Sequence, residues 1–279
     1  MRHTVLVVDD DKSLQVHLRS VLEKKGFRVL SALDAEEGLK VLSAENVDVA
    51  LLDIWMPGMN GLEMLERLRQ RNLAVQVIVM SGAGTQETAL SALRARAFDF
   101  LVKPFSPQDL LSAVQAALDF HKKGGIEVLS ARPEWIELRI ACHLSAVEPL
   151  ERIMVQLTAA LPADARENMA FAFREMLRNA IEHGGKNDPE RYVQVACLRT
   201  PRLILYRIKD PGEGFSPELL PHAALAENVD PIQHQRVREN LGLRPGGLGI
   251  LLTRMMVDEM IYNQCHNEVV LIRYLDSKH

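Results

Sequence analysis

The 279-residue sequence predicts two fold classes in one chain, a doubly wound parallel α/β domain followed by an α+β domain. Three observations support this prediction. The length exceeds that of an average single domain. Apolar runs and amphipathic stretches alternate regularly up to residue 121 and irregularly after about residue 130. Between these parts lies "HKKGG" at 121–125, a polar and Gly-containing break. We therefore predict domains at 1–122 and 131–279, joined by a linker at 123–130.

Five apolar runs of the first domain are predicted as strands: "TVLVV", "FRVL", "VDVALL", "VQVIVM" and "FDFLV". Most of them are continuously apolar, which is typical of strands that are covered on both faces. Amphipathic patterns between the strands predict helices at 12–25, 35–44, 61–70, 84–95 and 107–121. Repeated βα units of this kind build a parallel sheet with helices on both sides.

The elements of the second domain follow a different order. A strand "WIELRI" precedes two helices, the second of which contains "FREMLRNAIEHGG". The strands "YVQVAC" and "RLILYRIKD" follow, then a polar stretch at 216–245, a helix at about 248–258 and a last strand "EVVLIRYL". This order indicates one sheet with helices on one face.

Composition excludes several function classes. The chain has 33 Lys and Arg against 37 Asp and Glu, a net charge of -4, so direct binding to DNA has no electrostatic support. We see no apolar run long enough to span a bilayer and no signal peptide, which predicts a cytoplasmic protein without membrane contact. The three cysteines have no metal-binding spacing and are predicted to be reduced thiols.

Charged and hydroxyl side chains follow the predicted strands of the first domain. Asp9 and Asp10 end the first strand, Asp53 the third, Ser81 the fourth and Lys103 the fifth. Ligands of open parallel sheets bind at this edge. Carboxylate oxygens suit Mg²⁺, and a carboxylate beside the metal could act as a nucleophile towards a phosphoryl group. The lysine and the hydroxyl could hold phosphate oxygens.

The segments "VLVVDDD", "LLDIWMPGMNGLEML", "VMSGAG" and "FLVKPF" resemble the receiver domain of two-component response regulators. The resemblance covers residues 3–121. It implies a phosphoprotein that takes a phosphoryl group from an upstream sensor histidine kinase in a phosphorelay. It also implies these roles: phosphoacceptor Asp53, Mg²⁺ ligands Asp9, Asp10 and Asp53, switch hydroxyl Ser81, phosphate-binding Lys103 and rotating aromatic Phe100.

A second set of polar residues lies in the second domain. Glu175 and Asn179 are four apart and share one helix face, where a carboxylate and an amide need partners. "DPGEGF" then places Asp210 at the end of an apolar strand, before Gly212 and Gly214. "RPGGLGILLTRMMVDEM" places two more glycines, Gly247 and Gly249, before a helix, where free N–H groups can bind phosphate.

This order of motifs resembles the Bergerat-type ATPase fold of histidine kinases, gyrase-like ATPases and anti-sigma-factor kinases. The resemblance covers roughly 131–279 and implies ATP and Mg²⁺ as cofactors, with residues 216–245 as the ATP lid. It implies that Asn179 binds Mg²⁺, that Asp210 accepts from the adenine amino group, and that four glycines lie along the nucleotide: Gly212, Gly214, Gly247 and Gly249.

Glu175 indicates the branch of this family. Histidine kinases commonly have a second Asn four residues before the Mg²⁺ ligand. The hydrolytic ATPases and the anti-sigma-factor serine/threonine kinases have Glu there, which activates a water or a substrate hydroxyl because a carboxylate can take the proton. Arg254 and Asp258 also match the motif helix of that group. Val270 departs from it, because related ATPases often have a Thr there that helps to hold the adenine.

We therefore predict a response regulator whose receiver controls an ATP-dependent serine/threonine kinase, with Glu175 as the base. Its predicted partners are an anti-anti-sigma-like antagonist protein and a sigma factor. Two alternatives stay open: an ATP-dependent module that sequesters a partner without phosphotransfer, and a histidine kinase domain that acts on a phosphoacceptor in another protein. The sequence leaves open the direction of control by Asp53, the partner's identity and whether the chain forms a homodimer.

Overall fold

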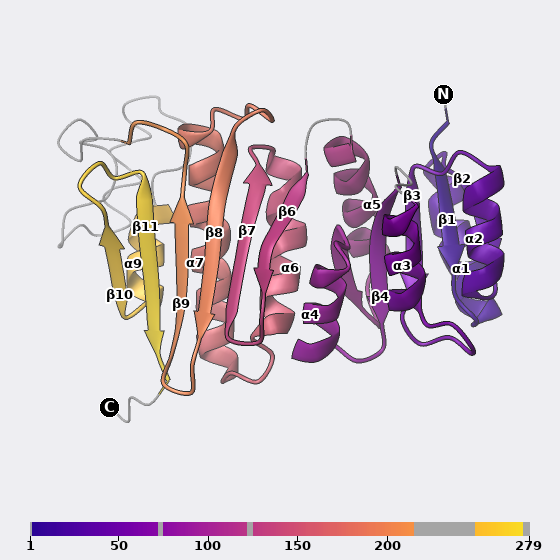
Figure 1. Cartoon of the computed structure of the whole chain (residues 1–279), viewed down its shortest axis with the longest axis horizontal. Helices are drawn as coiled ribbons and strands as arrows, with labels where there is room; N and C mark the ends of the chain where they lie inside the picture. Colours follow the sequence, from indigo (N-terminus) through magenta and orange to yellow (C-terminus); the bar gives the residue numbers. More distant parts are fainter. Residues whose placement is uncertain (1, 72–74, 122–124, 215–248, 276–279) are drawn as a thin grey trace. The chain divides into compact units, whose positions relative to one another are not determined.

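The computed structural model describes residues 2–71, 75–121, 125–214 and 249–275, which belong to two compact units (Figure 1). The first unit comprises Met1–Ala131 and Glu148–Ala160, and the second unit comprises Arg132–Val147 and Leu161–His279. The first unit thus contains a short segment of the predicted second domain.

A parallel five-stranded sheet in the order β2-β1-β3-β4-β5 is the centre of the first unit. Its strands are β1 (Thr4–Val8), β2 (Arg28–Ala32), β3 (Val49–Asp53), β4 (Gln76–Ser81) and β5 (Asp99–Val102). Its helices are α1 (Lys12–Lys24), α2 (Ala35–Ala44), α3 (Gly61–Gln70), α4 (Gln86–Arg94) and α5 (Pro107–His121). The predicted doubly wound fold is confirmed.

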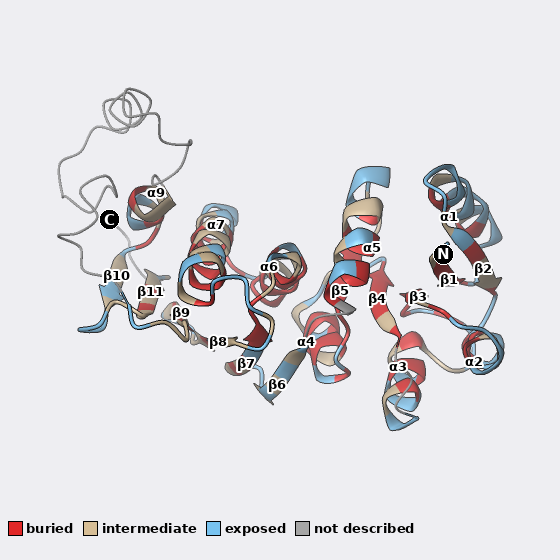
Figure 2. Cartoon of the chain, turned by 90° about the horizontal axis from the view of Figure 1, so that it is seen from above, coloured by how far each residue is buried: buried red, intermediate tan, exposed pale blue. Residues whose placement is uncertain are grey.

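Burial explains why the strands of this sheet are continuously apolar. Every residue of β1 and β3 is buried, because helices cover both faces of the sheet. Figure 2 shows α1 and α5 on one face and α2, α3 and α4 on the other. Side-chain caps begin several of these helices, as where Asp11 accepts from the backbone N–H groups of Ser13 and Leu14 at the start of α1.

The second sheet has six strands in the order β10-β11-β9-β8-β7-β6. Its strands are β6 (Ile126–Ala131), β7 (Trp135–Ala141), β8 (Tyr192–Arg199), β9 (Leu203–Lys209), β10 (Glu259–Tyr262) and β11 (Glu268–Tyr274). The pairs from β7 through β8, β9 and β11 to β10 are antiparallel. Buried and partly exposed residues alternate strictly along β9, as expected where only one face of a sheet is fully covered.

Along the chain, helices lie between the strands of this sheet without regular alternation, as the sequence predicts for an α+β domain. They are the short helix η1 (Leu144–Ala146), α6 (Val147–Leu157), α7 (Ala163–Asn179), the π-helical turn η2 (Ala180–Gly184) and α9 (Gly249–Met256). Figure 2 shows α7 and α9 on the same face of the sheet. Among the helices in the described ranges, none combines the length and the apolar character that crossing a membrane requires.

The structure differs from the predicted elements at two places. Strand β6 occupies most of the predicted linker at 123–130. It was not predicted because "IEVLSA" is too short and too polar to indicate a strand without its neighbour β7. The helix expected to reach residue 258 ends at Met256, and β10, which the sequence analysis missed, begins at Glu259. The predicted ATP lid at 216–245 lies outside the described residues.

Candidate functional site

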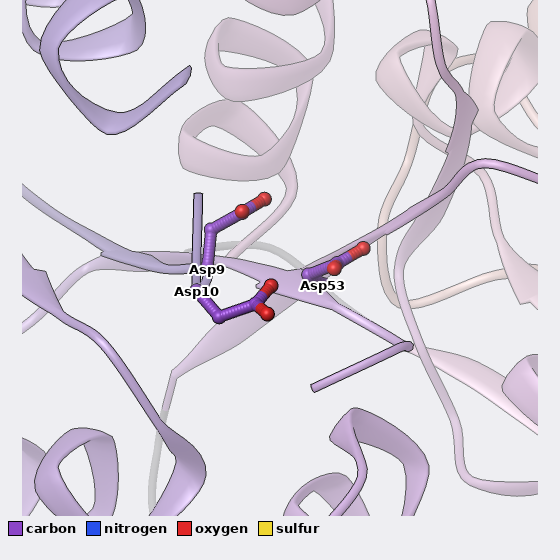
Figure 3. Close-up of side chains that lie close together, drawn as sticks. All are labelled: Asp9, Asp10 and Asp53. Carbon is purple, nitrogen blue, oxygen red and sulfur yellow. The ribbon is translucent and has the colours of Figure 1, made fainter. Parts of the chain in front are cut away.

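Three carboxylates gather at the carboxyl edge of the first sheet, where β1 and β3 end side by side (Figure 3). One oxygen each of Asp9, Asp10 and Asp53 lies within 4.8 Å of the others. Asp9 and Asp53 are buried, whereas Asp10 is exposed. Parallel neighbouring strands produce this cluster, because their last residues come to the same edge. Three hard oxygen ligands at this spacing fit a Mg²⁺ ion that keeps some of its water ligands.

Lys103 connects two of these carboxylates. Its Nζ lies 2.7 Å from Oδ2 of Asp9 and 3.0 Å from Oδ1 of Asp53. Burial raises the pKa of Asp53, and the hydrogen bond and charge of Lys103 offset part of this rise. Burial by itself would lower the pKa of Lys103, but its bonds to the two carboxylates raise it. The lysine therefore stays charged beside the carboxylate that the sequence predicts as phosphoacceptor.

Ser81 and Phe100 complete the predicted residues of this edge. Ser81 is fully buried at the end of β4, and its Oγ donates to the carbonyl of Ala83 at 2.9 Å. Phe100 is buried within β5. With Asp53 unmodified, the Ser81 hydroxyl thus has a backbone partner, and a phosphoryl group on Asp53 would offer it a competing acceptor.

The sequence analysis missed Gly61, the first residue of α3, as part of this edge. A Cβ at Gly61 would lie 2.0 Å from the backbone oxygen of Asp53, so only glycine lets α3 begin this close to β3. The signal was present in "MPGMNGLEML", where a capping Asn precedes a glycine.

The second candidate site lies at the carboxyl end of α7. Glu175 and Asn179 occupy its last turns, both partly exposed, and α7 continues into the π-helical turn η2. Such turns are frequent at functional sites. The Glu175 carboxylate lies beside the first residue of α9. A Cβ on Gly249 would be 2.7 Å from Oε2 of Glu175. Carboxylate, amide and helix N-terminus therefore belong to neighbouring elements of the second unit.

Asp210 meets the end of η2. Its Oδ1 accepts from the backbone N–H of Gly212 at 2.7 Å, and burial raises the pKa of its carboxyl group. A Cβ on Gly184 would lie 2.2 Å from Cγ of Asp210, and one on Gly212 would lie 3.1 Å from Cα of Gly184. The glycines thus let the Asp210 carboxylate and two backbone segments pack closely together.

The remaining predicted residues of this site are distributed over the second unit. Gly214 has a φ of +87°, and a Cβ there would collide with the carbonyl oxygen of Cys265. Gly247 lies outside the described residues. Arg254 is exposed on α9, Asp258 accepts from Arg273 at 2.9 Å, and Val270 lies in the middle of β11.

Asn267 and Gly184 belong to the surroundings of Asp210 although the sequence analysis assigned them no role. The side-chain amide of Asn267 donates to the carbonyl of Gly212 at 2.9 Å. The backbone carbonyl of Asn267 accepts from the N–H of Asp210 at the same distance. The glycine pair that ends "FREMLRNAIEHGG" was a usable signal for Gly184. No local pattern could reveal Asn267, since β-sheet pairing brings it to Asp210 from far along the chain.

The Gly184→Ala variant is expected to weaken Mg·ATP binding at least about tenfold, because the new Cβ displaces the Asp210 carboxylate. The same overlap should destabilise the fold by about 1–3 kcal/mol, the usual cost of overpacking. Calorimetric titration and urea unfolding measure the two effects. Gly125→Ala is the matched control, because a Cβ there meets nothing within 4 Å. Equal ATP affinity in both variants would contradict this role of Gly184.

Comparisons with known protein families match two separate parts of the chain. Residues 5–115 match the response regulator receiver domain family, and residues 140–273 match the histidine kinase-like ATPase domain family. Both predicted resemblances are confirmed at this level, whereas the anti-sigma-factor kinase branch is a finer assignment that these matches do not reach.

Two relatives that illustrate the similarity each match less than half of the chain. The nitrogen assimilation regulatory protein NtrX of Azorhizobium caulinodans is 34% identical over 121 residues, which are 43% of this chain and 27% of that protein. The alkaline phosphatase synthesis transcriptional regulatory protein PhoP of Bacillus subtilis is 34% identical over 118 residues, or 42% of this chain and 49% of that protein. The chain thus spans about a quarter to a half of these relatives.

Among solved structures, the CheY-like response regulator receiver domain protein from Methanospirillum hungatei is 32% identical, with a TM-score of 0.43. The match covers 44% of this chain and 98% of that one.

Proposed function

We propose, from the premise that this chain is a two-component response regulator with a receiver domain and a histidine kinase-like ATPase domain, that its output is serine/threonine phosphotransfer. In this proposal, modification of Asp53 controls the ATPase domain, and Glu175 is its general base. The domain boundaries at 1–122 and 131–279 remain part of the proposal, although β6 begins within the predicted linker and extends to Ala131.

The residues of the first site suit an aspartyl phosphorylation. An Asp53 carboxylate oxygen would attack the phosphorus of a phosphohistidine on an upstream sensor kinase, so that a P–O bond forms as the P–N bond breaks. Asp9 and Asp10 are placed to share a Mg²⁺ ion with Asp53. The Lys103 ammonium lies 3.0 Å from the reacting carboxylate, where it can neutralise charge that develops on the phosphoryl oxygens.

The residues of the second site fit Mg·ATP. Bound Mg·ATP would supply the phosphoryl group. Asn179 offers an amide oxygen to the metal, and Asp210 offers a carboxylate oxygen to an exocyclic amine. The close glycine contacts at Gly184 and Gly212 keep side-chain bulk away from the Asp210 carboxylate, which supports a planar ligand beside it.

The position of Glu175 is the observation that carries the kinase proposal. Its carboxylate lies one helical turn before Asn179 and against the first residue of α9, where phosphate groups are expected to bind. A carboxylate there can take the proton of a serine or threonine hydroxyl while the hydroxyl oxygen bonds to the γ-phosphorus and ADP leaves. An amide in its place could not accept that proton.

Removing either nucleotide ligand is expected to weaken Mg·ATP binding by about 10- to 100-fold, since a hydrogen bond to a charged group is worth about 1.5–3 kcal/mol. Asn179→Ala removes the metal ligand. In Asp210→Asn, the amide oxygen would keep the bond to the Gly212 N–H and turn an NH₂ group towards the adenine amine. Calorimetric titration of both variants measures the loss.

Asp164→Asn is the matched control for this titration, because that side chain is 71% exposed in the first turn of α7. Wild-type affinity in both Asn179→Ala and Asp210→Asn would rule out the ATP-binding proposal.

The proposed substrate is a small anti-anti-sigma-like antagonist protein, and the partner released or captured through it is a sigma factor. Both follow from the kinase branch that Glu175 indicates. Incubation of the full chain with labelled ATP and candidate antagonist proteins tests the assignment, and label on a serine or threonine of the antagonist is the expected result.

A further inference from the structure

Asp99, the first residue of β5, is a carboxylate with no exposed surface. One of its oxygens accepts from the Phe100 backbone N–H at 2.7 Å and from Nε of Arg152 at 2.9 Å. The other oxygen accepts from Nη2 of Arg152 at 2.5 Å. Burial of a carboxylate is unfavourable without a paired cation, and a bidentate guanidinium is the strongest such partner. Arg152 therefore makes the burial of Asp99 tolerable.

Helix α6 brings Arg152 to this position and contacts the first unit at two further places. Oε2 of Glu148 accepts from the Ser112 hydroxyl of α5 at 2.7 Å. The side-chain oxygen of Gln156 lies 2.3 Å from where a Cβ of Gly84 would be, so it packs on the loop between β4 and α4. These contacts are one turn apart along α6, at residues 148, 152 and 156. The helix thus offers one polar face to β5, α5 and that loop.

The contacted segments also carry the phosphoacceptor site. Lys103, bound to Asp9 and Asp53, directly follows β5, the four-residue strand that Asp99 begins. The loop that contains Gly84 follows Ser81, the last residue of β4. The Ser81 hydroxyl donates to the carbonyl of Ala83 in this loop, and a phosphoryl group on Asp53 would compete for that hydroxyl. Only a few residues along the chain therefore separate the phosphoacceptor site from the segments that Arg152 and Gln156 contact, which are two of the three contacts of α6.

By sequence, however, α6 belongs to the other domain. It lies inside the segment 140–273 that matches the ATPase family, and α7, with Glu175 and Asn179, follows it after Pro162. By its contacts, the segment Glu148–Ala160, which contains α6 from its second residue onwards, belongs to the first unit. Allosteric coupling requires one element whose arrangement both sites can bias. Helix α6 is the candidate for such an element, because it carries Arg152 and is followed along the chain by α7.

We propose that α6 is the output element of the receiver and that the Asp99–Arg152 pair holds it in place while Asp53 is unmodified. Phosphorylation of Asp53 loosens this pair, α6 is released, and the change passes along the chain into α7. Arg152 is thus a positioning residue for the nucleotide site. The release of α6 rests on the proposed phosphorylation of Asp53, and the effect on ATP rests in addition on the proposed nucleotide site.

Hydrogen exchange on the full chain, with and without beryllofluoride and Mg²⁺ as a mimic of the aspartyl phosphate, tests the release. The mimic is expected to speed amide exchange in residues 148–160 several-fold in the wild type. The double variant Asp99→Asn/Arg152→Met removes both charges together, which avoids leaving one of them buried alone. It is expected to exchange rapidly in this segment without the mimic and to show no further increase. Arg28→Met, which breaks an exposed pair with Glu45, should behave as the wild type.

Two results would overturn the inference: an unchanged or slower exchange of residues 148–160 in the wild type with beryllofluoride, or a wild-type increase in the double variant. ATP titration of the same samples separates this inference from the proposed function. The mimic should change the wild-type ATP affinity and leave that of the double variant unchanged. If the wild type releases α6 but binds no ATP, the proposed function fails and the output role of α6 stands. Release without any effect on measurable ATP binding would overturn the coupling to α7.

Discussion

Asp53→Asn is expected to abolish phosphoryl incorporation from a small-molecule phosphodonor with Mg²⁺, whereas the wild type takes up a single phosphoryl group. The substitution replaces the nucleophilic oxygen by an amide and leaves the other residues of the edge in place. Asp9 is also a carboxylate bound to Lys103, so uptake by the wild type alone would single out Asp53 as the phosphoacceptor. Intact-mass analysis of the two proteins measures the effect directly.

Asp34→Asn is the matched control for this experiment. Asp34 is an exposed carboxylate that caps α2 by accepting from the Glu37 N–H, and Asn caps helices about as well as Asp. This variant should be phosphorylated as the wild type is. Equal uptake by Asp53→Asn and the wild type would contradict the assignment of the phosphoacceptor.

Glu175→Gln is expected to lose phosphotransfer to a partner protein by about 10²–10⁴-fold, the usual contribution of a positioned base. Its affinity for ATP and for the partner should stay close to the wild-type values. The reason is that the carboxylate accepts the hydroxyl proton only in the transition state, and an interaction confined to the transition state affects rate and not binding. Transfer of label from ATP to the partner, together with calorimetry, separates the two effects.

Glu167→Gln is the matched control, because it changes an exposed carboxylate on the same helix. Treating each labelled product with acid distinguishes the alternatives. A serine/threonine kinase gives acid-stable label, and a histidine kinase acting on another protein gives an acid-labile phosphoramidate. A module that only sequesters its partner gives no label in the wild type or in Glu175→Gln. Acid-stable label that persists undiminished in Glu175→Gln would show that another residue is the base.

The receiver fold could be predicted almost element by element because its signals are local. Continuous apolar runs mark strands that are buried on both faces, and the carboxyl end of each run shows which side chains reach the binding edge. The helix bounds predicted at 35–44, 61–70 and 107–121 agree with α2, α3 and α5. In this parallel sheet each βα unit brings the end of its own strand to the binding edge, so the position of each strand-end residue follows from the local sequence.

The second sheet and its site were less predictable because they form by pairing between distant segments of the chain. Strand β6 has too little apolar periodicity to be recognised without β7, and β10 is a four-residue strand that exists through its pairing with β11. Glu175 and Asn179 could be found because one helix places them on one face. Their relation to Asp210 and Gly249 depends on contacts between α7, α9 and the end of β9, which no local pattern encodes.

The sequence by itself determined the two fold classes and the chemistry at each strand and helix end, because residue type, spacing and apolar periodicity are properties of short segments. Only the tertiary structure decided which unit α6 belongs to. "VEPLERIMVQL" reads as an ordinary amphipathic helix of the second domain, and "FDFLV" as an ordinary strand of the first. Asp99 and Arg152 are 53 residues apart, and their pairing depends on the fold bringing a buried carboxylate to a guanidinium. Because Asp99 is buried in the folded chain, it needs the guanidinium of Arg152 as a partner, and this pair attaches α6 to β5.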